Sequence, residues 1–247
     1  MTRRVVVDPV PSPERVREQV CDGFRPGSRD AGWAGVAVDV LRASSTLTRA
    51  KANGAARILP FADTASAVEW RERAPGTLAC GEREGRIVPG FDLGNSPFEY
   101  SAERVAGRTL AFASTNGSRA MLSLWGCDRR WLGAFVNAHA VLAALDDAPR
   151  VRIACAGKLG EPCDEDLAFA GWLCAELEAR GWALEGEPAR SCAAAAPRDA
   201  EAVRARVEDS EHGRYLSLLG PEFAADVRWC ATLDVLGEAH EFGPPAD

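Results

Sequence analysis

Chemically active side chains gather directly after three short apolar runs that predict β-strands. The runs are Gly35–Val40, Thr109–Ala113 and Val151–Cys155. The side chains that end or follow them are Asp39, Arg42, Ser44 and Ser45, then Ser114, Thr115, Asn116, Gly117 and Arg119, and then Lys158, Asp164, Glu165 and Asp166. Because binding sites of open α/β sheets lie at the carboxyl ends of the strands, we expect these groups to share one site. Hydroxyls, an amide and fresh helix N–H groups are suited to holding an oxyanion.

Each of these groups also has a structural interpretation. Ser44, Ser45 and Ser114 are residue types that commonly cap helices. The acids from Asp164 to Asp166 favour a helix start through the helix dipole. Asp39 ends an apolar strand, where a buried charge is costly unless it is paired or bound to a metal. A salt bridge between Asp39 and Arg42 is therefore the alternative to a role in a site.

A long loop in the middle of the chain carries an unusual mixture of residues. The segment 81–97 contains several glycines together with Glu82, Arg83, Asp92 and Asn95. Long ordered loops in compact domains are frequently functional, so we expect this loop to contribute to the site. The alternative is a charged surface loop with turn glycines.

The elements that would position these groups alternate between strands and helices. Predicted strands are Arg4–Val7, Gly35–Val40, Arg57–Phe61, Thr77–Cys80, Thr109–Ala113, Trp131–Phe135 and Val151–Cys155. Predicted helices are Ser44–Asn53, Thr64–Arg73, Pro97–Val105, Ser118–Leu124, Ala138–Leu145 and Glu165–Arg180. Several strands are continuous apolar runs, as a sheet covered on both faces requires. The pattern predicts a three-layer α/β/α fold with a largely parallel or mixed sheet.

The organisation of the chain is predicted as one domain over residues 1–247. A faint internal echo between the segments 42–55 and 113–127 leaves two similar lobes, about 1–100 and 101–247, as the alternative. The Pro- and Ala-rich stretch Glu185–Ala200 predicts a connection, and the residues after it predict helices that pack back on the body.

Composition excludes several classes of function. The 247 residues include 29 Lys and Arg against 36 Asp and Glu, a net charge of −7, which argues against nucleic-acid binding. Apolar runs fall short of the ~18–20 residues that span a bilayer, so we expect a cytoplasmic protein with no membrane partner. The 8 cysteines form no CxxC pair and are expected to be reduced and mostly buried. Homo-oligomerisation stays open.

Taken in order, the motifs resemble the 2-phosphosulfolactate phosphatase family, from about Val36 to Asp234. The matching strings are Val38–Thr46 (VDVLRASST), Ala52–Ala55 (ANGA), Gly81–Arg83 (GER), Gly90–Pro97 (GFDLGNSP), Ser114–Ser118 (STNGS), Cys155–Gly157 (CAG), Glu165–Asp166 (ED), Ser210–Gly213 (SEHG), Leu218–Gly220 (LLG) and Asp226–Val227 (DV). Members of this family hydrolyse 2-phospho-3-sulfolactate to 3-sulfolactate and phosphate with Mg²⁺, a step of coenzyme M biosynthesis.

The resemblance and the residues together imply a site for a small anionic phosphorylated substrate. Expected Mg²⁺ ligands are Asp39, Asp92, Glu165 and Asp166. Expected catalytic groups are Asp39, Arg42, Glu82 and Asn116, and expected substrate-binding groups are Ser44, Ser45, Arg83, Asn95, Ser114, Thr115, Gly117, Arg119 and Lys158.

Two questions stay open at this point. A phosphatase could use Asp39 as a nucleophile or let water attack the phosphate directly, and direct attack is preferred because the DxDx[TV] pattern is missing, with Leu41 at its second acidic position. A non-catalytic binder of a phosphorylated or sulfonated metabolite is the alternative to an enzyme, and a phosphatase of another small phosphoester is a third interpretation.

Overall fold

Two β-sheets lie on either side of a shared pair of helices in the computed structural model, which describes residues 2–21 and 30–243. The larger sheet is parallel throughout, in the order β7-β2-β8-β1-β9. Its strands are β1 (Arg4–Asp8), β2 (Ala34–Val38), β7 (Arg129–Gly133), β8 (Arg150–Cys155) and β9 (Ala183–Leu184). The smaller sheet has the order β3-β6-β4-β5, and β5 alone is antiparallel among its described strands. Its strands are β3 (Arg57–Pro60), β4 (Thr77–Arg83), β5 (Arg86–Ile87) and β6 (Thr109–Ala113).

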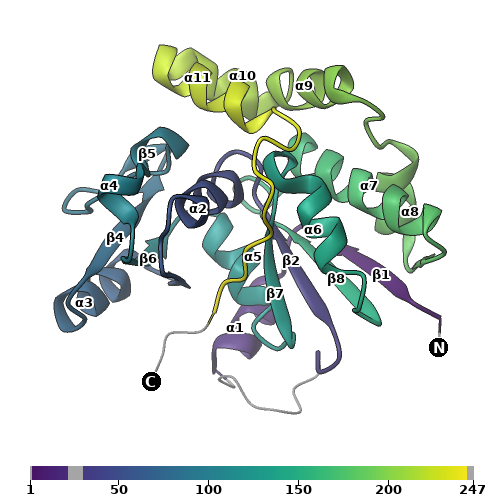
Figure 1. Cartoon of the computed structure of the whole chain (residues 1–247), viewed down its shortest axis with the longest axis horizontal. Helices are drawn as coiled ribbons and strands as arrows, with labels where there is room; N and C mark the ends of the chain where they lie inside the picture. The colour runs from purple at the N-terminus through teal and green to yellow at the C-terminus, as the bar shows by residue number, and fades with distance from the viewer. Residues whose placement is uncertain (1, 22–29, 244–247) are drawn as a thin grey trace.

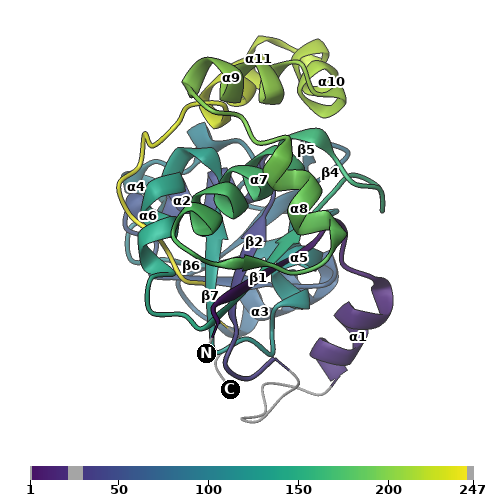
Figure 2. The same ribbon diagram turned by 90° about the vertical axis from the view of Figure 1, so that its right-hand side faces the viewer.

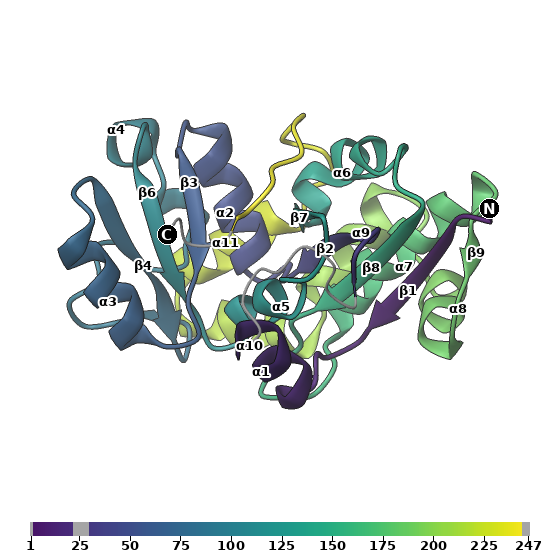
Figure 3. The same cartoon turned by 90° about the horizontal axis from the view of Figure 1, so that it is seen from below.

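Helices cover both faces of the larger sheet (Figure 3). Alternate residues of β2 point to opposite faces, so Val36 and Val38 join one core and Ala37 joins the other. The first core contains α6 (Ala138–Ala144) and α7 (Asp164–Ala179), and the second contains α2 (Ala43–Ala52) and α5 (Gly117–Ser123). The prediction of a three-layer α/β/α fold is confirmed.

The remaining helices lie around this frame. The helix α1 (Pro13–Cys21) contacts α5, and α3 (Thr64–Arg73) packs on the smaller sheet. Short helical turns are Pro97–Glu99, α4 (Ala102–Val105) and Phe135–Asn137. The last helices, α9 (Ala200–Glu208), α10 (Glu211–Leu219) and α11 (Pro221–Cys230), form a layer of their own above the sheets in Figures 1 and 2. We call this layer the helical cap, and it confirms the expectation that the tail packs back on the body.

All seven strands predicted from the sequence are present, with bounds that differ by no more than three residues. The strand β2 ends at Val38, so Asp39 and Val40 follow the strand rather than belong to it. The expected helix over 97–105 is divided into a 3₁₀ turn and α4, because Ser96 caps the turn and Glu99 reaches back in a capping box.

The prediction of a connection over Glu185–Ala200 is wrong, because residues Glu187–Ala194 form the helix α8. Pro188 occupies the first turn, where its missing N–H costs nothing, and the alanines that follow are strong helix formers. Ala189 and Ala193 are buried and extend the core beside α7.

The organisation as one domain stays a prediction. The two sheets come from separate stretches of the chain. The smaller sheet is made from residues 57–113, and the larger sheet is made from residues 4–38 and 129–184. Among the described residues, no helix is both long enough and apolar enough to cross a membrane.

A glycine allows α7 and α8 to pack closely. A Cβ atom at Gly171 would lie 2.2 Å from the backbone oxygen of Cys192. Because neither helix backbone can yield cheaply, we expect Gly171→Ala to lower the free energy of unfolding by about 1–3 kcal/mol. The matched control is Gly237→Ala, since a Cβ atom there meets no atom within 4 Å. Thermal and urea unfolding of both variants measures the difference, and equal stability would contradict the close packing.

Candidate active site

A cavity of about 670 Å³ opens at the edge of the molecule where strands of both sheets end. Val38 of β2, Gly133 of β7 and Cys155 of β8 lie at the same level of the larger sheet, so the residues that follow β2 and β8 share one edge. The smaller sheet brings the ends of β4 and β6 to the same cavity. Residues that line it are Asp39, Leu41, Arg42, Glu82, Arg83, Glu84, Gly85, Asn95, Thr115, Asn116, Lys158, Leu159, His212, Tyr215 and Leu216.

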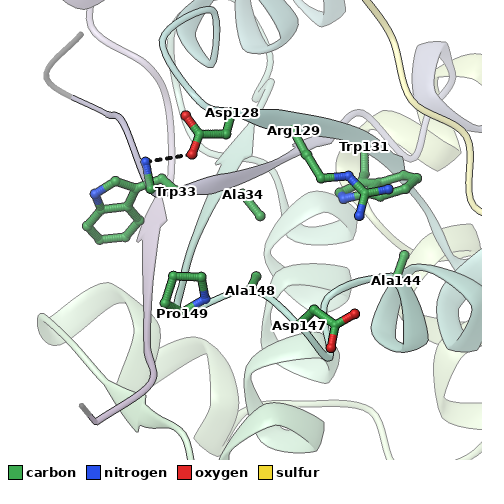
Figure 4. Close-up of a pocket in the computed structure, with 10 residues that line it drawn as sticks. Trp33, Ala34, Asp128, Arg129, Trp131, Ala144, Asp147, Ala148 and Pro149 are labelled. Carbon is green, nitrogen blue, oxygen red and sulfur yellow. Dashed lines mark hydrogen bonds between the residues drawn. The ribbon is translucent and has the colours of Figure 1, made fainter. Parts of the chain in front are cut away.

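A second hollow lies at the opposite ends of the strands (Figure 4). It has a volume of about 200 Å³ and is lined by the first residues of two strands, Ala34 of β2 and Arg129 of β7. Asp128 accepts a hydrogen bond from the backbone N–H of Gly32 there, at 2.8 Å. None of the residues predicted for the site lines this hollow, and parallel sheets bind their ligands at the other edge, so we assign the site to the larger cavity.

Asp39 lies at the bottom of the candidate site, with 8% of its surface exposed. Its Oδ1 accepts a hydrogen bond from the backbone N–H of Ala43 at 3.1 Å, and no described residue bonds Oδ2. Burial raises the pKa of Asp39 to about 6, opposed by the charge of His212 and reinforced by the charges of Glu82 and Glu165. A carboxylate of this kind is poised to bind a cation or to exchange a proton near neutral pH.

The close approach of α5 to Asp39 requires a glycine. A Cβ atom at Gly117 would lie 2.5 Å from Asp39 Oδ2 and 2.5 Å from Ala43 Cβ. Gly117 therefore shapes the site through its missing side chain rather than by contacting the cavity.

Two further carboxylates lie behind Asp39 and do not line the cavity. Asp166 Oδ1 accepts from the backbone N–H of Val40 at 2.8 Å, and its Oδ2 accepts from that of Gly157 at 3.0 Å. Burial, together with the charges of Asp39 and Glu165, raises the pKa of Asp166 well above its usual range. Asp166 thus ties the loops after β2 and β8 together.

Glu165 is 1% exposed and is paired with a residue of the helical cap. Its Oε1 lies 3.0 Å from Nδ1 of His212, and Oε2 has no hydrogen-bond partner among the described residues. Burial alone would raise the pKa of Glu165, but the hydrogen bond and the charge of His212 outweigh it and lower that pKa. Glu165 therefore stays ionised while buried.

The alternative interpretation, a salt bridge between Asp39 and Arg42, is wrong, because Arg42 pairs with Asp226 of α11. Arg42 Nη1 lies 2.5 Å from Asp226 Oδ2, and Nη2 donates to the backbone oxygen of Gly85 at 2.6 Å. The guanidinium also lies over the ring of Phe223, 5.1 Å from its centroid. Asp226 accepts a second hydrogen bond from Ser96 Oγ at 2.6 Å. Arg42 lines the cavity, but much of its charge is already balanced.

Glu82 fixes the loops of the smaller sheet around the cavity. Its Oε1 accepts from the backbone N–H of Thr115 at 2.9 Å, and its Oε2 accepts from that of Gly85 at 2.8 Å. Asn116 Oδ1 accepts from the backbone N–H of Leu159 at 3.3 Å and so links this side of the cavity to the loop after β8.

The cations with most freedom to meet an anion are Arg83 and Lys158. Arg83 donates to the backbone oxygens of Glu82 and Ala113, at 2.8 and 3.4 Å. Lys158 lies 3.3 Å from the exposed Glu211, a surface ion pair of small strength, and over the ring of Tyr215. Two buried polar atoms on the same wall, Asn95 Oδ1 and Thr115 Oγ1, lack a partner within the described part of the chain. Unpartnered atoms of this kind indicate a ligand that completes them.

Several residues predicted for the site are not brought to the cavity. Ser44 Oγ bonds Asp39 N–H and the Ala37 oxygen, and Ser45 Oγ bonds the Val40 oxygen. Ser114 Oγ accepts from the Ser118 N–H, so it caps the turn. Asp92 accepts from the Ala79 N–H and pairs with Arg71 at 3.3 Å. Arg119 does not line the cavity. The serine hydroxyls are thus used in local hydrogen bonds. The interpretation of Ser44 and Ser45 as helix caps is wrong, because both lie inside α2 and its N-cap is Arg42.

The helical cap supplies the wall residues that the sequence did not single out, namely His212, Tyr215 and Leu216 of α10. The SEHG string in the sequence contained His212. Ser210, the first residue of this string, caps α10 by accepting a hydrogen bond from the backbone N–H of Gly213 at 2.9 Å. What the string could not show is that α10 folds over the ends of β2 and β8.

The cavity wall carries oxygen atoms of the kind that bind Mg²⁺. Within residues 2–21 and 30–243, no three His, Cys, Asp or Glu side chains are placed to share one metal ion. Mg²⁺ keeps several waters and needs only one or two protein oxygens beside a phosphate. Asp39 Oδ2 and Asn95 Oδ1, both unpartnered and on the cavity wall, are oxygen atoms of the type that Mg²⁺ prefers. Asp39 and Asn95 therefore fit Mg²⁺. The other expected ligands are engaged elsewhere: Asp92 by Arg71, Asp166 by backbone amides and Glu165 by His212.

Comparison with known proteins identifies the family. Residues 25–239 match the family model described as 2-phosphosulpholactate phosphatase. The chain belongs to the 2-phosphosulfolactate phosphatase family. A protein of Thermotoga petrophila named probable 2-phosphosulfolactate phosphatase is 35% identical over 204 residues, which cover 81% of this chain and 85% of the relative. A protein of Deinococcus radiodurans with the same name is 37% identical over 199 residues, 79% of this chain and 82% of the relative.

Membership confirms the resemblance drawn from the motifs and makes the chain an enzyme, a phosphoric monoester hydrolase. The alternative of a non-catalytic binder is correspondingly disfavoured.

The buried charge of Asp39 gives a prediction about stability and pH. The folded-state pKa of about 6 lies above the ordinary value of 3.8, so the folded chain holds this proton more tightly than the unfolded chain. Raising the pH from 4 to 7 therefore lowers the contribution of Asp39 to the free energy of unfolding. Asp39→Asn keeps the oxygen that bonds Ala43 and lacks the charge. Its melting temperature relative to the parent chain should rise steadily between pH 4 and pH 7 without added metal.

The control for this prediction is Asp146→Asn, which removes an exposed carboxylate paired with Arg180. Its melting temperature should follow that of the parent chain throughout. A loss of stability in Asp39→Asn at pH 7 would mean that a cation of the protein pairs with Asp39.

Proposed function

We propose that this chain is an Mg²⁺-dependent phosphatase that hydrolyses 2-phospho-3-sulfolactate, or a closely related phosphorylated hydroxy acid, to the hydroxy acid and phosphate. One observation carries the proposal beyond family membership. Side chains from the ends of four strands in two sheets meet in one cavity, where the buried carboxylate of Asp39 shares the wall with the cations Arg83 and Lys158. Phosphate transfer depends mainly on such positioning and charge stabilisation.

The substrate is bound by groups with unused hydrogen-bonding capacity. Arg83 suits bidentate contact with a phosphate or sulfonate, whereas Lys158 acts as a point charge at the mouth of the cavity. Thr115 Oγ1 can donate to an oxygen of the anion. These contacts place positive groups for the anion on a wall that also carries Asp39, Glu82 and Glu84, in a protein of net charge −7.

Asp39, with Asn95 as a second oxygen donor, would hold the metal. Bound Mg²⁺ would neutralise charge on the phosphate and orient it. Asp39 itself, with its raised pKa, also suits the orientation of the attacking water, which we prefer to an aspartyl-phosphate intermediate. A role in coenzyme M biosynthesis, a cytoplasmic location and homo-oligomerisation stay predictions from the sequence.

Phosphate release from a panel of phosphorylated hydroxy acids tests this function. Phosphate should be released fastest from 2-phospho-3-sulfolactate, excess chelator should abolish release, and added Mg²⁺ should restore it. Asp39→Asn should lower kcat by orders of magnitude while the fold is retained. Full activity in excess chelator would refute the metal, and a phosphate-sized mass adduct on the parent chain that Asp39→Asn lacks would refute direct attack by water.

A matched pair of arginine variants separates binding from folding. Arg83→Ala should raise KM strongly with little change in melting temperature, because its protein partners are backbone oxygens. Arg42→Ala should instead lower stability by about 3–5 kcal/mol, because it leaves Asp226 buried without its cation. Kinetics and thermal unfolding of both variants give the comparison. A stable Arg42→Ala chain with raised KM would assign Arg42 to the substrate after all.

A further inference from the structure

We infer that His212 is a catalytic residue of the reaction proposed above, the acid that protonates the departing ester oxygen, and that Glu165 is its positioning residue. The inference rests on the proposed phosphatase function and extends it. It assigns a role to the one part of the cavity wall that comes from the helical cap.

His212 contacts Glu165, and local helix structure fixes the position of each residue. Ser210 caps α10 and so places His212 in the first turn of that helix. Glu165 stands in the first turn of α7, at the carboxyl edge of the larger sheet. The side chain of His212 is 16% exposed and that of Glu165 is 1% exposed. His212 Nδ1 lies 3.0 Å from Glu165 Oε1. The imidazole ring also stacks on Tyr215, with 6.5 Å between centroids.

This contact determines which nitrogen faces the cavity. Nδ1 donates its proton to the ionised Glu165, so Nε2 is the nitrogen left for the substrate, and no described residue bonds it. A buried carboxylate on one side of an imidazole holds the orientation of the ring, as the acid of a catalytic triad does, and leaves the other nitrogen for the substrate. In the proposed step Nε2 is therefore the atom from which the proton is given.

The other charged groups on the wall do not suit this step. Arg42 and Arg83 hold their protons too tightly to release them near neutral pH. Lys158 is assigned to binding the anion in the proposed function, with the exposed Glu211 as a weak surface partner. Asp39 is the group proposed to hold the metal, so it is not the acid.

In the proposed step a water molecule attacks phosphorus and keeps both of its protons, so that the product is dihydrogen phosphate. The bond from phosphorus to the ester oxygen breaks with its electron pair going to that oxygen. The Nε2 proton of His212 moves to the same oxygen, which becomes the hydroxyl of the hydroxy acid. The imidazole regains a proton from solvent after phosphate leaves. An alkoxide is a poor leaving group, so protonation in the transition state contributes about 10²–10⁴-fold to the rate.

Dependence on the leaving group tests this role. The full chain, His212→Asn and Glu165→Gln are assayed with Mg²⁺ on 2-phospho-3-sulfolactate and on p-nitrophenyl phosphate, whose phenolate leaves without protonation. His212→Asn should lose about 10²–10⁴-fold in kcat on the alkyl ester and less than tenfold on the aryl ester. Glu165→Gln should show the same asymmetry to a smaller degree. His139→Asn, at an exposed histidine that pairs with Asp234, should match the parent chain on both esters.

The outcomes separate the two proposals. Equal losses on both esters in a folded His212→Asn chain, or no loss on either, would overturn the role of His212 and leave the phosphatase function standing. A parent chain that hydrolyses the aryl ester and other alkyl phosphates but not 2-phospho-3-sulfolactate would overturn the proposed substrate alone, since the alkyl-to-aryl ratio still measures His212. A parent chain without activity on any phosphate ester would overturn both.

Discussion

Three carboxylates buried side by side at the edge of a parallel sheet are the constraint on which the site depends. Asp39, Glu165 and Asp166 are each less than 10% exposed, and their charges act on one another. Such a cluster is tolerated only where each acid is neutral, hydrogen-bonded or paired. The fold meets this requirement differently for each: backbone amides bond Asp166, an imidazole pairs with Glu165, and Asp39 is left facing the cavity.

The helical cap follows from the same constraint. Because His212 belongs to α10, the ionised Glu165 ties the cap to the sheet, and the Arg42–Asp226 pair forms a second tie from α11. Each tie ends on a buried carboxylate, so removal of its partner leaves that carboxylate unpaired and is costly. The cap is therefore part of the site rather than a cover added to it.

Strand ends could be predicted from sequence because continuous apolar runs and the residues after them are local features. Asp39, Glu82, Asn116 and Lys158 were found in this way, and all four line the cavity. Contacts between distant segments could not be predicted so. Arg42 was predicted to act in the site, with a salt bridge to Asp39 as the alternative, but it pairs with a carboxylate 184 residues away. His212 was likewise missed, since no periodicity shows that α10 lies over the sheet edge.

The cavity residues come from two parts of the chain, namely the segment between β2 and β7, which contains the smaller sheet, and the remainder. The chain leaves the larger sheet after β2, builds the whole smaller sheet, and returns as β7, which is paired directly with β2. The smaller sheet is thus an insertion between two adjacent strands, and it carries Arg83, Asn95 and Thr115. Glu165, Asp166 and His212 belong to the remainder of the chain. Exchange of the insertion would therefore change which molecule is recognised, but it would also change the surroundings of Asp39, because the charge of Glu82 acts on Asp39 and Gly117 lies against its Oδ2.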